Sequence, residues 1–169
     1  MDLNRLPKEL LLKVFSYLSS ENIMHIRRIG EVCRDWYQLS LNSLLWMHIN
    51  LAYKRVNFDR FLVFQIRHNL LSNLAVLNLH GAYDVKHEQL IKIIDNVRFD
   101  CLKVLDISNC KHIKSSVFVK IADKFKKLEE LSIQSIIKNE VLIFNSAITA
   151  KLGILFFFFL LRTTSTMMT

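Results

Sequence analysis

Glycine and proline are scarce in this chain: of 169 residues, three are glycine and one is proline. So little of either excludes a collagen-like or linker-rich chain, and a hydrophobic share of 51% excludes intrinsic disorder. The length suits one domain, or a small module followed by a second unit. We therefore expect a folded chain with a substantial hydrophobic core.

Cysteine is also scarce, with Cys33, Cys101 and Cys110 as its three occurrences. An odd number without paired spacing does not indicate a disulfide framework, so we interpret them as small apolar residues in a reducing compartment. Charged residues interrupt the N-terminal apolar run, and no secretory signal is evident. We expect the protein in the cytoplasm, the nucleus or both.

Motifs for catalysis and metal binding are missing from the sequence as well. The six histidines have no paired metal-ligand spacing, and Cys101, Cys110 and His112 do not form a usual zinc arrangement. No P-loop, dinucleotide-binding fingerprint or nucleophile elbow occurs. We predict that the chain is not an enzyme and holds neither metal nor cofactor.

The N-terminus, in contrast, is strongly patterned. Leu6-Pro7 opens a helix predicted over about residues 7–18, since proline suits the first helical turn. Apolar residues recur in it at helical spacing and are expected on one face: Leu10, Leu11, Val14, Phe15 and Leu18. Residues 19–21 are a candidate N-cap and acidic first turn of a second helix. Gly30 indicates a break before a third helix that runs through Trp36.

Four pieces of this region stand in the order and at the spacing of an F-box: Leu6-Pro7, Val14 to Leu18, Val32-Cys33-Arg34-Asp35-Trp36, and Leu45-Trp46 with Ile49-x-Leu51. Residues 3–51 thus resemble an F-box, the helical motif that binds the Skp-type adaptor of SCF ubiquitin ligases, and we assign residues 1–50 to it. A few extra residues between Ile23 and Trp36 affect the expected length and angle of the second helix. The resemblance implies that some residues contact the adaptor and others form the motif's own core: Leu6, Pro7, Leu10, Leu11, Val14, Phe15, Leu18, Ile26, Val32 and Trp36.

The chain then repeats the frame L-x-x-L-x-L. The frames begin at Trp46, Leu74, Leu102 and Leu128, which are 28, 28 and 26 residues apart, and a further match begins at Leu152. This spacing lies in the range of leucine-rich repeats. Residues 46–151 therefore resemble a short leucine-rich-repeat solenoid, in which each unit is a strand followed by a helix.

Segments with helical patterning lie between the frames, over about residues 61–71, 90–97 and 117–125, with Asp84 and Ser115-Ser116 as candidate caps. Cys110 stands at the Asn/Cys position of its repeat, as in the cysteine-containing subtype. The predicted fold is α+β: an N-terminal three-helix F-box followed by an α/β repeat.

Alternate residues of the predicted strands would line the open face of the sheet. An ordinary solvent-facing sheet is one interpretation of this face, and a target-binding surface is the other. The polar residues predicted to contact a target are His48, Asn50, Asn78, His80, Asp106, Ser108, Glu130, Ser132 and Gln134.

Residues 152–169 form an atypical tail that begins LGILFFFFLL. This apolar run is shorter than the about 20 residues of a membrane-spanning helix, so no membrane partner is expected. The tail fits either one further repeat strand or a truncated end. The net charge of +8 includes seven lysines between residues 103 and 127. A basic patch there could favour an acidic or phosphorylated partner or nucleic acid, but lysines spread over helix and loop positions usually form a solvated face, and no nucleic-acid partner is expected.

The combined pattern resembles that of F-box/leucine-rich-repeat proteins. The resemblance implies a non-catalytic substrate-recognition subunit of an SCF ubiquitin ligase. Its F-box would bind the Skp-type adaptor and, through it, the cullin–RING ligase, while its repeats would hold a target protein for ubiquitination and proteasomal degradation. Two alternatives stay open: a repeat scaffold without a ligase role, and a truncated fragment that sequesters the adaptor.

Overall fold

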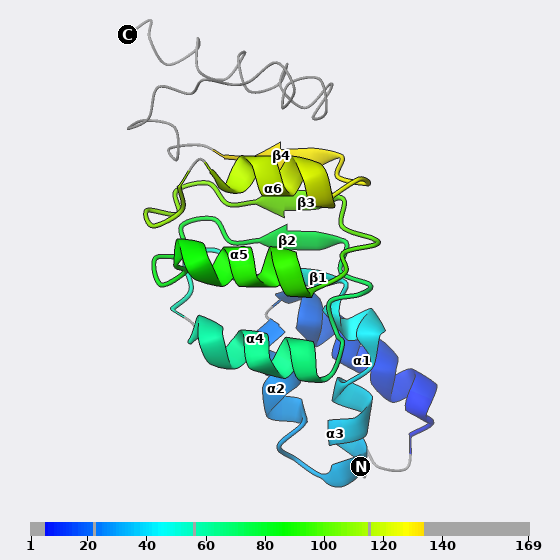
Figure 1. Cartoon of the computed structure of the whole chain (residues 1–169). Helices are drawn as coiled ribbons and strands as arrows, with labels where there is room; N and C mark the ends of the chain where they lie inside the picture. The colour runs from blue at the N-terminus through cyan, green and yellow to red at the C-terminus, as the bar shows by residue number, and fades with distance from the viewer. Residues whose placement is uncertain (1–5, 22, 56, 115, 134–169) are drawn as a thin grey trace, which may run out of the picture.

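The computed structural model describes residues 6–21, 23–55, 57–114 and 116–133. Helices α1 (Lys8–Glu21), α2 (Ile23–Ile29) and α3 (Arg34–Ser40) lead into a 3-10 helix, η2 (Ser43–Trp46), and strand β1 (His48–Asn50). Helices and strands then alternate: α4 (Phe58–Arg67), β2 (Val76–Asn78), α5 (His87–Asn96), β3 (Val104–Asp106), α6 (Val117–Lys124) and β4 (Glu130–Ser132). Figure 1 shows these units stacked above the three N-terminal helices.

The four described strands form one parallel sheet in the order β1-β2-β3-β4. Ile49, Leu77, Leu105 and Leu131 are aligned across it. Their separation along the chain equals the spacing of the sequence frames, so one repeat of sequence is one step of the sheet. A slip of one residue would turn the apolar side chains to the opposite face, and the leucines therefore set the register.

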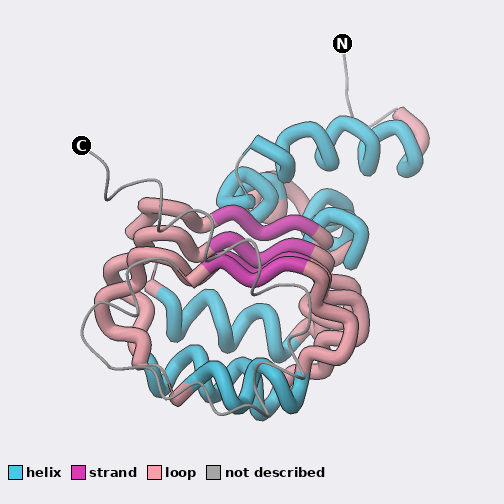
Figure 2. Tube along the Cα trace, turned by 90° about the horizontal axis from the view of Figure 1, so that it is seen from above, coloured by secondary structure: helices cyan, strands magenta, loops and turns pink. Residues whose placement is uncertain are grey.

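The core lies between the sheet and the helices that follow each strand. Seen along the stack, the strands superimpose on one side and α4, α5 and α6 on the other (Figure 2). The first frame leucines of the middle units, Leu74 and Leu102, are 0% and 1% exposed. Leu128 and Leu131 of the last described unit are only partly buried, because no later described unit packs on them.

The N-terminal helices close the opposite end of the stack. Both α1 and α2 contact β1. The side-chain amide of Asn73, in the segment before β2, donates a 2.9 Å hydrogen bond to the hydroxyl of Ser43 in η2. The buried residues of the helices and of the sheet belong to one hydrophobic cluster. The three-helix region is therefore continuous with the strand–helix units.

The structure has the predicted arrangement of helices before a small parallel sheet, and Gly30 ends α2 as expected. The second helix is different, because residues 19–21 continue α1 and do not cap α2. The hydroxyls of Ser16 and Ser19 donate to the carbonyls three residues earlier, at 2.7 and 2.8 Å. These bonds satisfy the two serines inside a helix, so the helix continues past them.

The caps of the later helices also differ from the prediction. Asp84 is not the cap of α5, because Lys86 occupies that position. The backbone N–H of Lys86 donates a 2.9 Å hydrogen bond to the side-chain oxygen of Gln89. Ser116 precedes α6 without a side-chain capping bond. Its hydroxyl instead lies 3.3 Å from Nε2 of His87 in the preceding unit.

Several predictions fall outside the described residues. They concern Ser115, Gln134, the frame that begins at Leu152 and the tail over residues 152–169. Among the residues that are described, no helix has the length and apolar character needed to cross a membrane.

Candidate functional site

Helix α1 presents an apolar stripe to solvent. Leu10, Val14 and Tyr17 stand at i, i+4 and i+7, and they are 49%, 47% and 65% exposed. Residues at this spacing lie on one side of an α-helix. Two further apolar side chains of the N-terminal region, Val32 and Leu44, are each 63% exposed. Such a row of large apolar side chains on one helix is a surface that a protein partner can cover.

The side of α1 next to this stripe packs against the other two helices. Leu11 and Phe15 are 5% and 1% exposed, and Ile26 of α2 is fully buried. The ring of Phe15 meets that of Trp36 edge to face, with 5.1 Å between their centroids. Edge-to-face pairs of this kind add to the stability from burial alone. These side chains form the local core and are not available to a partner.

The ten predicted adaptor-binding residues therefore separate into groups. Leu11, Phe15 and Ile26 are buried, while Leu6, Leu18 and Trp36 are partly buried against the core. The remaining residues, Pro7, Leu10, Val14 and Val32, are exposed. The apolar residues predicted on one face of α1 thus differ in exposure, as the resemblance implied, because the elements that contact α1, among them α2, η2 and β1, cover only part of that face.

The predicted target-binding residues also differ in their exposure to solvent. His48, Asn50 and Glu130 are exposed, and Asn78, His80, Asp106 and Ser132 are partly exposed. Ser108 is 2% exposed, so its proposed place on an open surface is wrong. It lies two residues beyond β3, and its backbone carbonyl accepts a 2.8 Å hydrogen bond from the Gly81 N–H of the preceding unit.

Three of these polar side chains have a structural role at the ends of the strands. The side-chain oxygens of Asn50, Asn78 and Asp106 each accept a hydrogen bond from the backbone N–H two residues later, at 3.1, 2.9 and 2.8 Å. This local bond directs the chain into a turn. An Asn or Asp residue at the last position of each of these three strands thus ends the strand. The alternation of exposed residues along a strand does not predict this role.

Sequence reasoning missed two residues that meet His80. The hydroxyl of Tyr53 lies 2.7 Å from His80 Nε2, and the amide nitrogen of Asn109 lies 3.0 Å from the same atom. His80 Nδ1 is 3.5 Å from a carboxylate oxygen of Asp106. The repeat could have indicated that these residues lie near one another, because Tyr53 stands one repeat before Gly81 and Asn109 stands one repeat after it.

Cys110 ties two units together. Its thiol donates a 3.1 Å hydrogen bond to the backbone carbonyl of Leu79, and the residue is 2% exposed. Burial raises the pKa of the Cys110 thiol to about 11. A buried thiol that holds its proton is a poor nucleophile. The prediction that Cys110 is a small core residue agrees with this environment, and its bond explains why a hydrogen-bonding side chain suits the position.

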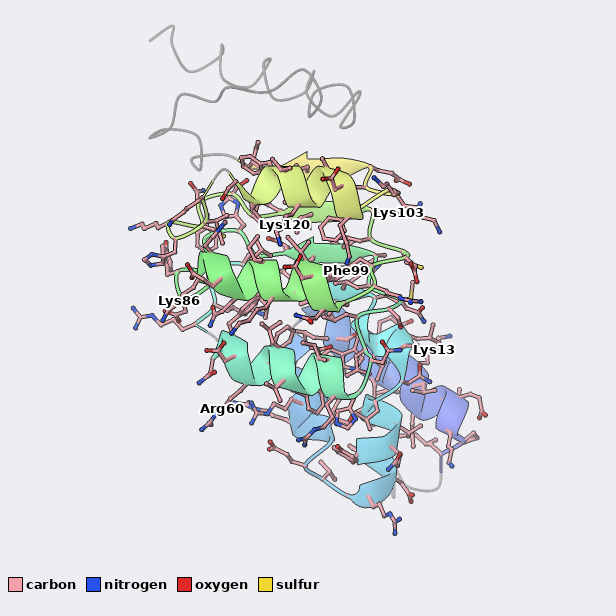
Figure 3. The ribbon with its side chains drawn as sticks, in the orientation of Figure 1. Lys13, Arg60, Lys86, Phe99, Lys103 and Lys120 are labelled. Atoms are coloured by element: carbon pink, nitrogen blue, oxygen red, sulfur yellow. The ribbon has the colours of Figure 1, made fainter. Side chains whose placement is uncertain are left out.

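Two of the lysines after residue 102 form ion pairs. Lys103 pairs with Glu129 at 2.8 Å and Lys120 with Asp95 at 2.6 Å. The hydrogen bond that the Lys103 ammonium donates to Glu129, together with the negative charge of that carboxylate, raises the pKa of Lys103. Figure 3 shows Lys86 and Lys103 at opposite edges of the stack. No group of three or more His, Cys, Asp or Glu residues that would suit a metal ion occurs in the described part of the chain.

One family comparison bears on this geometry. Residues 3–52 match the F-box-like family. The match extends from the start of the described chain through β1 and so includes the exposed stripe of α1 and the core behind it. The chain therefore carries an F-box-like region, and F-box proteins are generally non-catalytic adaptors that act through protein interaction.

Proposed function

We propose that this protein is the substrate-recognition subunit of an SCF-type cullin–RING ubiquitin ligase. The observation that carries the proposal is the F-box-like match at residues 3–52 together with the exposed stripe Leu10, Val14 and Tyr17 on its first helix. We propose that this stripe packs against the Skp-type adaptor. The remaining residues of the motif, such as Phe15, support the stripe from within.

The strand–helix units are proposed to be leucine-rich repeats that hold a target protein. Their parallel strands, the helix between each pair of strands and the 28-residue spacing support this assignment. We place the domain boundary near residue 50, where β1 serves both parts. Cytoplasm or nucleus is the proposed location.

The proposed mechanism is positional. Ubiquitin transfer takes place on other subunits, and this chain raises the effective concentration of target lysines near the ubiquitin-loaded enzyme. A rigid connection between the adaptor-binding helix and the target-binding units favours this role, because a fixed geometry limits the positions that the target can occupy. The continuity of the hydrophobic cluster from α1 to β4 supports such a connection.

The test is capture by a purified Skp-type adaptor. We compare the wild type with the double variant Leu10→Asp/Val14→Asp and with Val63→Asp, whose side chain is 60% exposed on α4, away from the stripe. Burying two carboxylates in an apolar contact is expected to abolish capture, since unpaired buried charge is costly. Val63→Asp is expected to bind as the wild type does.

Circular dichroism of all three proteins shows whether each is folded. Capture of the folded double variant at wild-type level contradicts the assignment of the stripe. Failure of the folded wild type to bind the adaptor contradicts the proposed function and favours a repeat scaffold without a ligase role.

A further inference from the structure

Tyr53 has an unusual backbone conformation. Its φ is +56°, and the residues one and two repeats later, Gly81 and Asn109, have φ of +61° and +59°. Glycine adopts this left-handed conformation without steric penalty, and asparagine tolerates it. A bulky aromatic residue does not, so the first of the three equivalent turns is the strained one.

The strained residue carries a side chain that is exposed but fixed. Tyr53 is 62% exposed. Its hydroxyl contacts His80 Nε2 at 2.7 Å, and the two ring centroids are 4.9 Å apart. A Cβ atom on Gly81 would lie 2.7 Å from two carbons of the Tyr53 ring, so the ring rests directly on the glycine.

The partner of Tyr53 is itself held in place. His80 is bounded by the Asn109 amide at 3.0 Å and by the Asp106 carboxylate at 3.5 Å. These contacts come from the next unit, so residues of three loops form the network that includes the Tyr53 hydroxyl. Side chains that are ordered before binding lose little entropy on binding. Strained residues that the surrounding structure holds in place are characteristic of functional sites.

Tyr53 stands at the edge where the strands end and the helices begin. Tyr83, 44% exposed, lies on the same edge, with the Lys111 ammonium 5.5 Å from its ring centroid. Tyr83 and Arg55 line an open groove of about 750 Å³ that crosses the turns before α4, α5 and α6, while Tyr53 and Lys111 lie next to these two residues in the chain or in space and do not line the groove. Tyrosine and arginine are the residue types that most often dominate protein interfaces.

The loops of this edge carry an excess of positive charge. The described parts of its three loops, residues 52–55, 80–86 and 108–114, carry Lys54, Arg55, Lys86, Lys111 and Lys114 against one acid, Asp84, before the helices begin. None of these five cations forms an ion pair with a described residue. The groove itself is lined by three of these cations, Arg55, Lys86 and Lys114, and by three carboxylates. Two of the carboxylates, Asp59 and Glu88, occupy the first turns of α4 and α5, where they stabilise the helix, so the excess of positive charge comes from Lys54 and Lys111 beside the groove.

We propose that Tyr53 is the anchor of a docking surface for an acidic segment of a partner protein. Apolar side chains of that segment cover the rings of Tyr53 and Tyr83, and its carboxylates pair with Arg55 and Lys111. Arginine binds carboxylates with two parallel hydrogen bonds, which fixes their orientation. The surface is the loop edge and not the open face of the sheet, where Asn50 and Asn78 are used in turns.

The partner in this inference is the target of the proposed ligase subunit, so the inference rests on the proposed function. The probe is a short fluorescein-labelled peptide in which Glu alternates with Leu, and its control replaces each Glu with Lys. Binding to the full-length protein is measured by fluorescence anisotropy. We expect the Glu peptide to bind and the Lys peptide not to bind; equal binding of the two peptides, or binding of neither, overturns the proposal.

Two variants test the residues. Tyr53→Gly gives the first turn the residue of the second, so the thermal midpoint should stay within a few degrees of wild type while binding of the Glu peptide weakens at least tenfold. Arg55→Glu/Lys111→Glu should abolish binding, whereas Arg98→Glu/Lys126→Glu, exposed outside these loops, should preserve most of it. Wild-type affinity in Tyr53→Gly, or in the first charge-reversal pair, overturns the proposal.

Adaptor capture is measured on the same samples. If the adaptor is captured and the Glu peptide does not bind, the docking surface is wrong and the proposed function stands. If the Glu peptide binds as expected and the adaptor is not captured, the docking surface stands and the ligase role is wrong.

Discussion

The indole N–H of Trp46 donates a 2.8 Å hydrogen bond to the backbone carbonyl of Ser40, the last residue of α3. Trp46 ends η2 and also begins the first repeat frame, and it is 2% exposed. Its ring centroid lies 5.9 Å from that of Phe64 in α4. One side chain thus joins the F-box-like region to the strand–helix units.

We expect Trp46→Phe to destabilise the protein by about 1–3 kcal/mol. The variant leaves the Ser40 carbonyl without its donor and reduces the volume that fills the junction. Urea denaturation followed by circular dichroism measures the change. Leu44→Phe is the control, since Leu44 is 63% exposed on the same 3-10 helix and should change the midpoint little. A Trp46→Phe midpoint equal to that of the wild type would show that the junction does not depend on this bond.

Substitutions on the two sides of α1 should differ in their effects on stability and on adaptor binding. Phe15→Ala is expected to cost about 3–5 kcal/mol, because it leaves a cavity between α1 and Trp36. Leu10→Ala is expected to change stability by less than about 0.5 kcal/mol, because Leu10 is half exposed. Denaturation midpoints and adaptor capture are measured on both variants. The result that contradicts the division is a large loss of stability in Leu10→Ala.

Gln65 is expected to be a site where a polar residue lowers stability. It is fully buried in α4, and neither its side-chain oxygen nor its nitrogen has a hydrogen-bond partner among the described residues. Gln65→Leu should therefore stabilise the protein by about 1–3 kcal/mol, the cost of a buried unpaired polar group. The urea midpoint measures the gain.

Gln89 provides the matched control for that substitution. It is also buried, but its side chain accepts a hydrogen bond from the Lys86 backbone at the start of α5. Gln89→Leu should lower stability by about 0.5–2 kcal/mol, because it removes the hydrogen bond between the Gln89 side chain and the Lys86 backbone N–H at the start of α5. Destabilisation by both substitutions would indicate that Gln65 is satisfied in solution.

Stability should fall at alkaline pH through Cys110. Burial raises the pKa of its thiol from 9.0 to about 11, so the folded protein keeps a proton that the unfolded chain releases earlier. The contribution of the protonated Cys110 thiol to the free energy of unfolding is therefore complete below pH 9 and is lost as the pH rises through about 11. Cys110→Ala, which copies Ala82 of the preceding unit, should show a smaller decline between these values in urea denaturation.

Alkylation gives an independent measurement of the same group. In the variant Cys33→Ser/Cys101→Ser, only Cys110 remains for reaction with iodoacetamide. Reaction of the folded protein should be slow at pH 9 and should increase towards pH 11, since the thiolate is the reactive form. Rapid alkylation at neutral pH would contradict the burial of this thiol.

The sequence alone was sufficient to predict the repeating part of the fold. Leu74, Leu77 and Leu79 recur as Leu102, Leu105 and Ile107, and each set is buried beside the other. Such a period determines the strand positions and their register, because each unit packs on a copy of itself. The N-terminal pattern likewise predicted the region that matches the F-box-like family.

Tertiary structure decided which side chains are available to a partner. Leu10 and Leu11 are neighbours of equal hydrophobicity, yet one is 49% exposed and the other 5%, because the elements that contact α1, among them α2, η2 and β1, cover Leu11 and leave Leu10 in solvent. Tyr53, His80 and Asn109 are far apart in the chain and meet only when successive units stack. A sequence pattern shows which residue types recur in each segment. The exposure and contacts of those residues depend on the segments that pack beside them in space.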